Sequence, residues 1–165
     1  MNVDQAESRV ITEQPTAVRR ATLAPPELPA WFDQAYADIA SYLSAHGIKH
    51  QGPPFARYHV RPDGRFDVEA GFPVAAPIAG TVTVRPSKLP GGAVVSLWHI
   101  GPYDRVGQTY AEIAAWIREV GASSAGDAWE IYHEPPADDP MQRRTEVVQP
   151  YTFPEAHEGA DSTLR

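Results

Sequence analysis

The feature that most constrains the fold of this chain is an internal repeat with a spacing of 74 residues, from Tyr36 to Tyr110. Residues 36–43, YADIASYL, match residues 110–117, YAEIAAWI, in chemical type at each position. The same spacing continues without an insertion as far as His59 and His133. A match of this length predicts two copies of one supersecondary unit that bury their apolar faces together.

Each copy contains the pattern of an amphipathic helix. In the first copy, apolar residues recur mostly at three- and four-residue steps over residues 31–43, between Pro29 and Gly47. In the second copy the same stripe covers residues 106–120 and stops before Gly121, a residue suited to the position after a helix. Both helices are therefore expected to bury one face.

Strand-like segments flank both helices. The expected strands are residues 17–23 and 93–100 before the helices, residues 55–61 and 66–74 after the first helix, and residues 129–134 and 145–151 after the second. Residues 81–84 fit either an additional strand or the start of the first strand of the second copy. The order strand-helix-strand-strand is typical of an α+β fold.

We therefore predict an α+β fold built from two pseudo-twofold-related strand-helix-strand-strand units, with antiparallel sheets that have helices on one face and a ligand cleft on the other. Residues 1–152 are expected to form a single domain, with repeat units at about 8–74 and 80–151. Residues 153–165 lack periodicity and hydrophobic mass, which predicts a disordered tail. The cleft is expected where the uncovered strand faces of the two units meet.

Composition excludes several classes of protein. The chain is 42% hydrophobic with four Trp and seven Tyr, which indicates a folded domain, and its apolar runs are too short to span a membrane. The net charge of −7 argues against a nucleic-acid partner, and the Arg19-Arg20 and Arg143-Arg144 pairs fit an ordinary solvated surface. The histidines have no metal-ligand spacing, and no cysteine is present. We expect a cytoplasmic protein without cofactor, metal or membrane partner.

One residue breaks the symmetry of the repeat. Glu130 lies in the aromatic segment WEIY, and its counterpart in the first copy is Ala56. Strand alternation places Glu130 on the same face as Tyr132, with Trp129 and Ile131 on the opposite face. If Trp129 and Ile131 pack on the helices, Glu130 faces the cleft. A carboxylate that is partly desolvated among aromatic rings is prepared for a cation.

Other interpretations of these residues are open at the level of sequence. Glu130 could instead pair with an arginine such as Arg57, or lie at an exposed edge. Tyr58 and Tyr132 are repeat mates on the same face, and they could contact a ligand or be core aromatics with satisfied hydroxyls. Further candidates for ligand contact are Trp98, Phe72 and Ala56.

Three segments of the chain resemble a known family. They are LPGGAVVSLWHIGPYD (residues 89–104), DAWEIYHEPP (residues 127–136) and TEVVQPY (residues 145–151). In this order they are similar to the GyrI-like small-molecule binding family, which is also found as the effector-binding domain of AraC- and MerR-type multidrug regulators. The resemblance covers roughly residues 8–151.

The resemblance implies a cleft that accepts lipophilic, often cationic aromatic compounds, with the ligand-reading acid at Glu130 in W-E-x-Y. It does not extend to direct transcriptional control, because the helix-turn-helix of the regulators has no counterpart here, although a partner protein could read the ligand state. Some similar proteins hydrolyse reactive cyclopropane-containing compounds, for which Glu130 and Tyr132 would be the catalytic residues. Others are associated with inhibition of DNA gyrase. Binding, hydrolysis and gyrase interaction are thus three alternatives.

Overall fold

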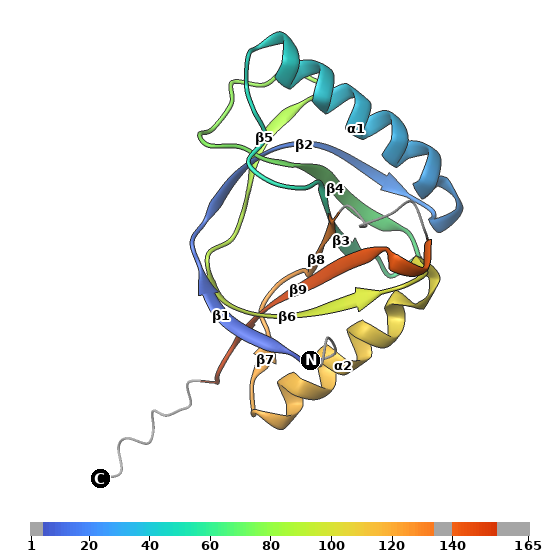
Figure 1. The fold of residues 1–165 in the computed structure, drawn as a ribbon, viewed down its shortest axis with the longest axis vertical. Coiled ribbons are helices and arrows are strands. Elements are labelled where there is room, and N and C mark those ends of the chain that lie inside the picture. Colours follow the sequence, from blue (N-terminus) through green and yellow to red (C-terminus); the bar gives the residue numbers. More distant parts are fainter. Residues whose placement is uncertain (1–4, 134–139, 155–165) are drawn as a thin grey trace.

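The computed structural model describes residues 5–133 and 140–154. Its strands form a curled antiparallel sheet, and both helices lie outside the curl (Figure 1). The helices are α1 (Leu28–Ala45) and α2 (Val106–Glu119), and short 3-10 helices cover Pro25–Glu27, Tyr103–Arg105 and Pro140–Gln142. The strands are β1 (Glu7–Ile11), β2 (Gln14–Leu23), β3 (Phe55–Val60), β4 (Phe66–Pro73), β5 (Arg85–Leu89), β6 (Gly92–Ile100), β7 (Ser123–Ser124), β8 (Trp129–His133) and β9 (Arg144–Thr152).

The order of the strands brings the two halves of the chain together at the centre of the sheet. The order is β1-β6-β9-β8-β3-β4-β2-β5, with β7 paired to β9. The central strands β3 and β8 pair in antiparallel fashion, and Ala56 lies directly opposite Glu130. Ala56 and Glu130, which the repeat equates, are therefore direct neighbours, and the pairs on either side, Phe55 with Ile131 and Arg57 with Trp129, are related by a local twofold axis between the strands.

Both helices pack on the same face of the sheet. Helix α1 covers β2 and β4, whereas α2 covers β6 and β9. Each helix is followed by a glycine in the left-handed region, Gly47 with φ +66° and Gly121 with φ +76°, which lets the chain reverse where a side chain would be strained. Strands β3 and β8 lie in the gap between the helices, so the residues on their outer face can line a cavity.

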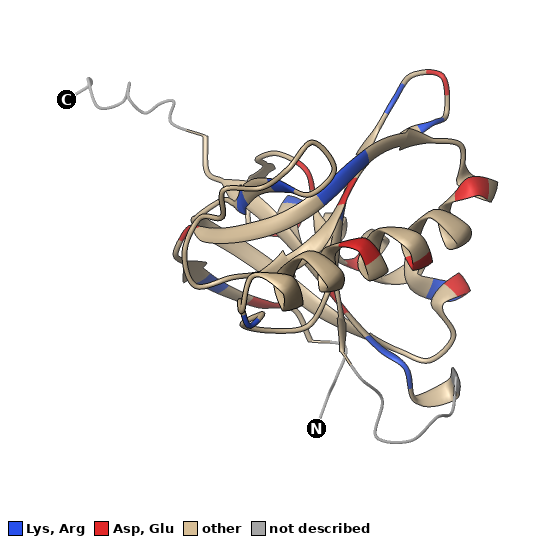
Figure 2. Ribbon diagram, turned by 90° about the horizontal axis from the view of Figure 1, so that it is seen from above, with Lys and Arg blue, Asp and Glu red and all other residues tan. Residues whose placement is uncertain are grey.

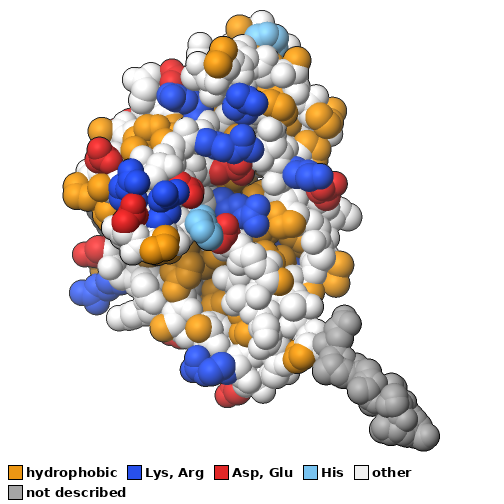
Figure 3. All heavy atoms as spheres, turned by 180° about the vertical axis from the view of Figure 1, so that it is seen from behind, with side chains coloured by type: hydrophobic (Ala, Val, Ile, Leu, Met, Phe, Trp, Pro, Cys, Tyr) orange, Lys and Arg blue, Asp and Glu red, His pale blue; other side chains and the backbone are white. Residues whose placement is uncertain are grey.

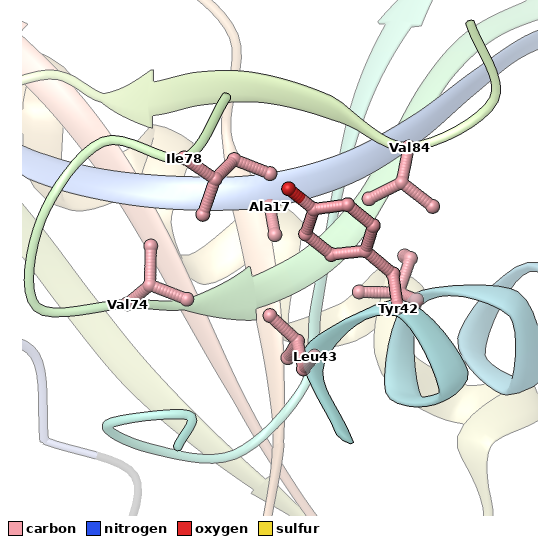
Figure 4. Packing of buried hydrophobic residues seen from close by; sticks show 7 residues of the cluster. Ala17, Tyr42, Leu43, Val74, Ile78 and Val84 are labelled. Carbon is pink, nitrogen blue, oxygen red and sulfur yellow. The ribbon is translucent and has the colours of Figure 1, made fainter. Parts of the chain in front are cut away.

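Each helix is fixed to the sheet by its own apolar cluster. Under α1, Tyr42 and Leu43 pack with Ala17 and Val84 (Figure 4), and the Tyr42 hydroxyl accepts a 3.0 Å hydrogen bond from the Gly80 N–H. Under α2 the cluster consists of Val95, Leu97, Ile113, Ile117 and Val147. These clusters hold the two helices apart on either side of β3 and β8.

The inner face of the curled sheet has a third cluster made only of strand residues. Phe55 and Trp129, 1% and 2% exposed, pack there with Val18, Val94 and Val148. The α+β fold class is confirmed. The cavity, however, lies on the face of the sheet that carries the helices and not on the opposite face. Trp129 does not pack on the helices, because the curl lets the sheet fill its own inner face; alternation then turns Glu130 to the face that carries both helices.

Most of the elements expected from the sequence are confirmed, with small shifts at their ends. The additional strand between the two halves is β5 at Arg85–Leu89, whereas residues 81–84 lie outside any strand. Strand β1 was not expected. The strand end at residue 134 and residues 155–165 of the expected tail lie outside the described residues, and the boundaries of the two repeat units stay a prediction.

Charged residues are spread over both helices and many strands (Figure 2). On the face seen in Figure 3, basic and acidic side chains lie next to each other rather than in a patch of one sign. Two of the ion pairs are Arg20 with Glu69 at 2.7 Å and Arg19 with Asp38 at 2.6 Å. Neither helix of the described residues is long and apolar enough to cross a membrane.

Candidate functional site

The centre of the candidate site is a buried carboxylate surrounded by phenols. Glu130 is 2% exposed, and its Oε1 accepts hydrogen bonds from the hydroxyls of Tyr103 at 2.6 Å and Tyr132 at 2.7 Å. Its Oε2 accepts a 2.5 Å hydrogen bond from the Tyr110 hydroxyl. Short charge-assisted hydrogen bonds of this kind compensate a carboxylate for the loss of water. The expected alternative of an arginine partner is not what the structure shows, since Arg57 lies over the Trp129 ring instead.

A fourth tyrosine extends this network. The Tyr58 hydroxyl lies 2.9 Å from the Tyr132 hydroxyl. A phenol has a single proton to donate, and Tyr132 donates its proton to Glu130, so Tyr58 must be the donor to Tyr132. The hydrogen bonds thus run from Tyr58 through Tyr132 to the carboxylate, and they fix the orientation of both rings.

The two copies of the repeat differ at the position of the carboxylate, and this changes the hydrogen bond of the helical tyrosine in each copy. Tyr36 is the repeat mate of Tyr110, on the equivalent face of α1. Because Ala56 stands where a second carboxylate would be, the Tyr36 hydroxyl donates instead to the Phe55 carbonyl oxygen at 2.6 Å. Tyr110 therefore bonds to a carboxylate on the α2 side, whereas Tyr36 bonds to a backbone carbonyl on the α1 side.

The phenols of the site stay protonated well into the alkaline range. Burial raises the pKa of Tyr58 to about 12, and the negative charge of Glu130 adds to the effect. Burial first and the Glu130 charge second also raise the pKa of Tyr103, Tyr110 and Tyr132. Burial and the neighbouring Tyr58 raise the pKa of Tyr36. At neutral pH the site is one carboxyl group among neutral hydrogen-bond donors.

These pKa values predict a loss of stability at high pH. Below about pH 10 the tyrosines are protonated in both the folded and unfolded states, so they add no pH dependence. As the pH rises above this value, the unfolded chain ionises first and the free energy of unfolding falls, through about pH 12 for Tyr58. We expect tyrosinate absorbance to appear together with loss of circular dichroism. Ionisation of all five phenols near pH 10 with the fold intact would contradict this expectation.

The carboxylate opens on a large cavity between the two helices. The cavity has a volume of about 1560 Å³, larger than the usual 300–1,000 Å³ of small-molecule pockets. Glu130, Tyr103, Tyr110 and Tyr132 line the α2 side. The α1 side is lined by a group of aromatic residues from α1, β3 and β4, namely Phe32, Tyr36, Tyr58, Phe66 and Phe72.

The structure brings four of the six residues expected at the site to one place. Glu130, Tyr132, Tyr58 and Phe72 all line the cavity. Ala56 is fully buried beneath it, opposite Glu130. Trp98 lies elsewhere: its ring is 4.5 Å from the His133 ring and 6.0 Å from the Arg144 guanidinium carbon, and it does not line the cavity.

Sequence reasoning missed two tyrosines that hold the carboxylate. In the sequence, Tyr110 belongs to the apolar stripe of a helix and Tyr103 to a family motif, and neither position is marked as a carboxylate partner. The signal for Tyr110 was its identity with Tyr36 across the repeat, which marks a helix face turned toward the central strands. In the described residues, no group of three or more His, Asp or Glu side chains is arranged to hold a metal ion.

An α+β fold with a large lined cavity fits the class of small-molecule binding domains. Residues 8–151 match the family model of the GyrI-like small molecule binding domain. The chain belongs to this family, as its sequence motifs indicated. No curated protein sequence matches the chain.

Solved structures share the fold at low sequence identity. The chain superimposes on the EcmrR C-terminal domain with a TM-score of 0.77 at 20% identity, covering 93% of this chain and 100% of that domain. It matches EcmrR in its complex with DNA with a TM-score of 0.79 at 18% identity, covering 93% of this chain but 59% of that longer one.

Two further solved structures with this fold are a hydrolase and a protein bound to a lipophilic cation. A hydrolase from Listeria innocua matches with a TM-score of 0.66 at 15% identity, covering 90% of this chain and 92% of that chain. SAV2435 bound to tetraphenylphosphonium also matches with a TM-score of 0.66, at 12% identity, covering 94% of this chain and 98% of that chain. These identities show a common fold and no more.

Proposed function

We propose that this protein binds lipophilic aromatic molecules that are cationic or polarised, with Glu130 as the acid that recognises them. The single observation that carries the proposal is a carboxylate, 2% exposed and held by three phenols, in the wall of a cavity of about 1560 Å³. Neutral phenols orient the carboxylate without neutralising it. Its negative charge therefore remains available to a cation that enters the cavity.

The opposite wall supports the same class of ligand. Phe32 stacks on Tyr36 with a centroid distance of 5.8 Å, and Phe72 meets the Tyr36 ring edge-on at 5.8 Å. Ring faces attract cations by about 0.5–2 kcal/mol each and also bury apolar ligand surface. A ligand with a positive centre and aromatic arms would place its charge near Glu130 and its arms on this wall. The binding of tetraphenylphosphonium by SAV2435 supports the choice of ligand class.

A pair of ligands with the same shape and opposite charge tests the proposal. Tetraphenylphosphonium and tetraphenylborate differ little in size, so their apolar burial is nearly equal, whereas Glu130 attracts the first and repels the second. We expect isothermal titration calorimetry to show binding of the cation at least about tenfold tighter than that of the anion. Equal affinity, or tighter binding of the anion, would overturn the proposal.

A hydrolase is the second candidate, favoured by the hydrogen-bonded series Tyr58, Tyr132 and Glu130. In this reaction Glu130 would activate a water and a phenol would polarise the electrophile. The geometry supports it less well, because three of the roughly four acceptor positions of the carboxylate receive phenol protons. Mass spectrometry after incubation with a cyclopropane-bearing electrophile tests it, and unchanged compound at high protein concentration would reject it.

A further inference from the structure

We propose that the end of the cavity at the start of β9 is a subsite for a ligand carboxylate, with Arg143 as its cationic residue. The preferred ligands would then be zwitterionic aromatic molecules rather than simple cations. This inference rests on the proposed function, because it concerns the same cavity. It assigns a role to a basic pair that, from the sequence alone, fits an ordinary surface.

The sheet register places Arg143 on the ligand side of the sheet. Thr145 pairs with Tyr132, and Val147 pairs with Glu130. Arg143 continues the ladder, since its carbonyl accepts a 2.8 Å hydrogen bond from the Gly101 N–H. Alternation therefore gives residue 143 the same facing as residues 145 and 147. Arg143 lines the cavity together with Thr145, Glu130 and Tyr132.

Among the described residues, no acid forms an ion pair with Arg143. The ion pairs found there involve other arginines, namely Arg9, Arg19, Arg20, Arg61 and Arg65. Arg143 is exposed and is part of the cavity lining. A guanidinium in this position can form a bidentate pair with a carboxylate.

The other charged residues that line the described part of the cavity lie away from Arg143 or have partners of their own. His59 pairs with Asp127 at 3.0 Å, on the β3 side. Asp33 lies on α1, across the cavity from β9. At the β9 end, His133 bonds to Glu146 at 3.1 Å, and the Arg144 guanidinium lies over the ring of Trp98, which is outside the cavity lining. Among the described residues, the lining thus has an acidic centre at Glu130, an aromatic wall on the α1 side and the cation Arg143 at the β9 end.

The separation of the two charges defines the ligand. Arg143 lies one residue before β9 and four residues from Val147, the residue opposite Glu130, which corresponds to about 13 Å at 3.3 Å per residue. A framework of two or three fused aromatic rings with a carboxylate on one substituent bridges such a distance.

Rhodamine B and its ethyl ester test the inference, because they share one cationic ring system and differ in a free carboxylate. The measured quantity is the ratio of their dissociation constants, obtained by fluorescence anisotropy with the full chain. In Arg143→Gln we expect the free carboxylate to lose about threefold in affinity relative to the ester, as one solvent-accessible ion pair is removed. Arg118→Gln on α2, exposed and remote from the cavity lining, makes the same change in net charge and should leave the ratio unaltered.

The possible results distinguish failure of the carboxylate subsite from failure of the proposed function. An unaltered ratio in Arg143→Gln, with the ester still bound, would overturn the carboxylate subsite and leave the proposed function standing. A similar change in Arg118→Gln would also overturn it, because the effect would then come from net charge. Failure of the wild type to bind the ester would overturn the proposed function and the subsite together. Arg143→Lys, which keeps the charge, should retain most of the wild-type ratio.

Discussion

Glu130→Gln is expected to weaken the binding of tetraphenylphosphonium by about thirtyfold, or about 2 kcal/mol. Glutamine has nearly the same size as glutamate, and its amide oxygen can still accept the hydrogen bonds of Tyr103 and Tyr132, which share Oε1. Its amide nitrogen would then donate to the Tyr110 hydroxyl, which bonds to the other oxygen of the carboxylate, so the cavity keeps its shape. What is lost is the negative charge that attracts the cation. Isothermal titration calorimetry of wild type and variant measures the difference.

Glu146→Gln is the matched control for this prediction. Glu146 is also a buried acid, 8% exposed, and it lies on the neighbouring strand β9, where it accepts hydrogen bonds from Arg9 and His133. It does not line the cavity. The same loss of one negative charge at Glu146 should change affinity for the cation by less than about threefold. Equal losses in the two variants would show that net charge, and not the site, governs binding.

Phe55→Ala is expected to lower the free energy of unfolding by about 3–5 kcal/mol. Phe55 is 1% exposed on the inner face of the sheet, where it packs with Val18, Trp129 and Val148, and no helix can move in to fill the space it leaves. Its carbonyl, which accepts the Tyr36 hydroxyl, is unchanged by the substitution. Urea denaturation followed by circular dichroism measures the loss.

Val60→Ala on the same strand is the comparison variant, because Val60 is 66% exposed. We expect it to change stability by no more than about 0.5 kcal/mol. A loss below about 1 kcal/mol for Phe55→Ala would mean that the inner cluster contributes little to the fold. The curl of the sheet would then need another explanation.

The local elements of this fold could be predicted because their signals are local. The helix stripes and the glycines that follow them, Gly47 and Gly121, place α1 and α2 within a few residues of their observed ends. Strand β1 has no such signal: four of its five residues are exposed, so no alternation marks it. It pairs with β6 at the sheet edge, and side-chain contacts of Arg9 with Glu146 and of Ile11 with the inner cluster add to this pairing.

The location of the site could be predicted only in part. Glu130 stands out because its repeat mate is Ala56, a comparison that needs only the sequence. The side of the sheet it faces depends on how strongly the sheet curls, which period-two alternation does not encode. Trp98 has the same strand-aromatic pattern as residues of the cavity, yet it lies against His133 and outside the lining.

A crystal structure of the complex with tetraphenylphosphonium would show whether a cation binds beside Glu130. We expect the phosphonium centre between α1 and α2, within contact distance of the Glu130 carboxylate, with phenyl rings against Phe32, Tyr36 or Phe72. Density for the ligand on the inner face of the sheet or on the outer surface, with the Glu130 side chain uncontacted, would contradict it.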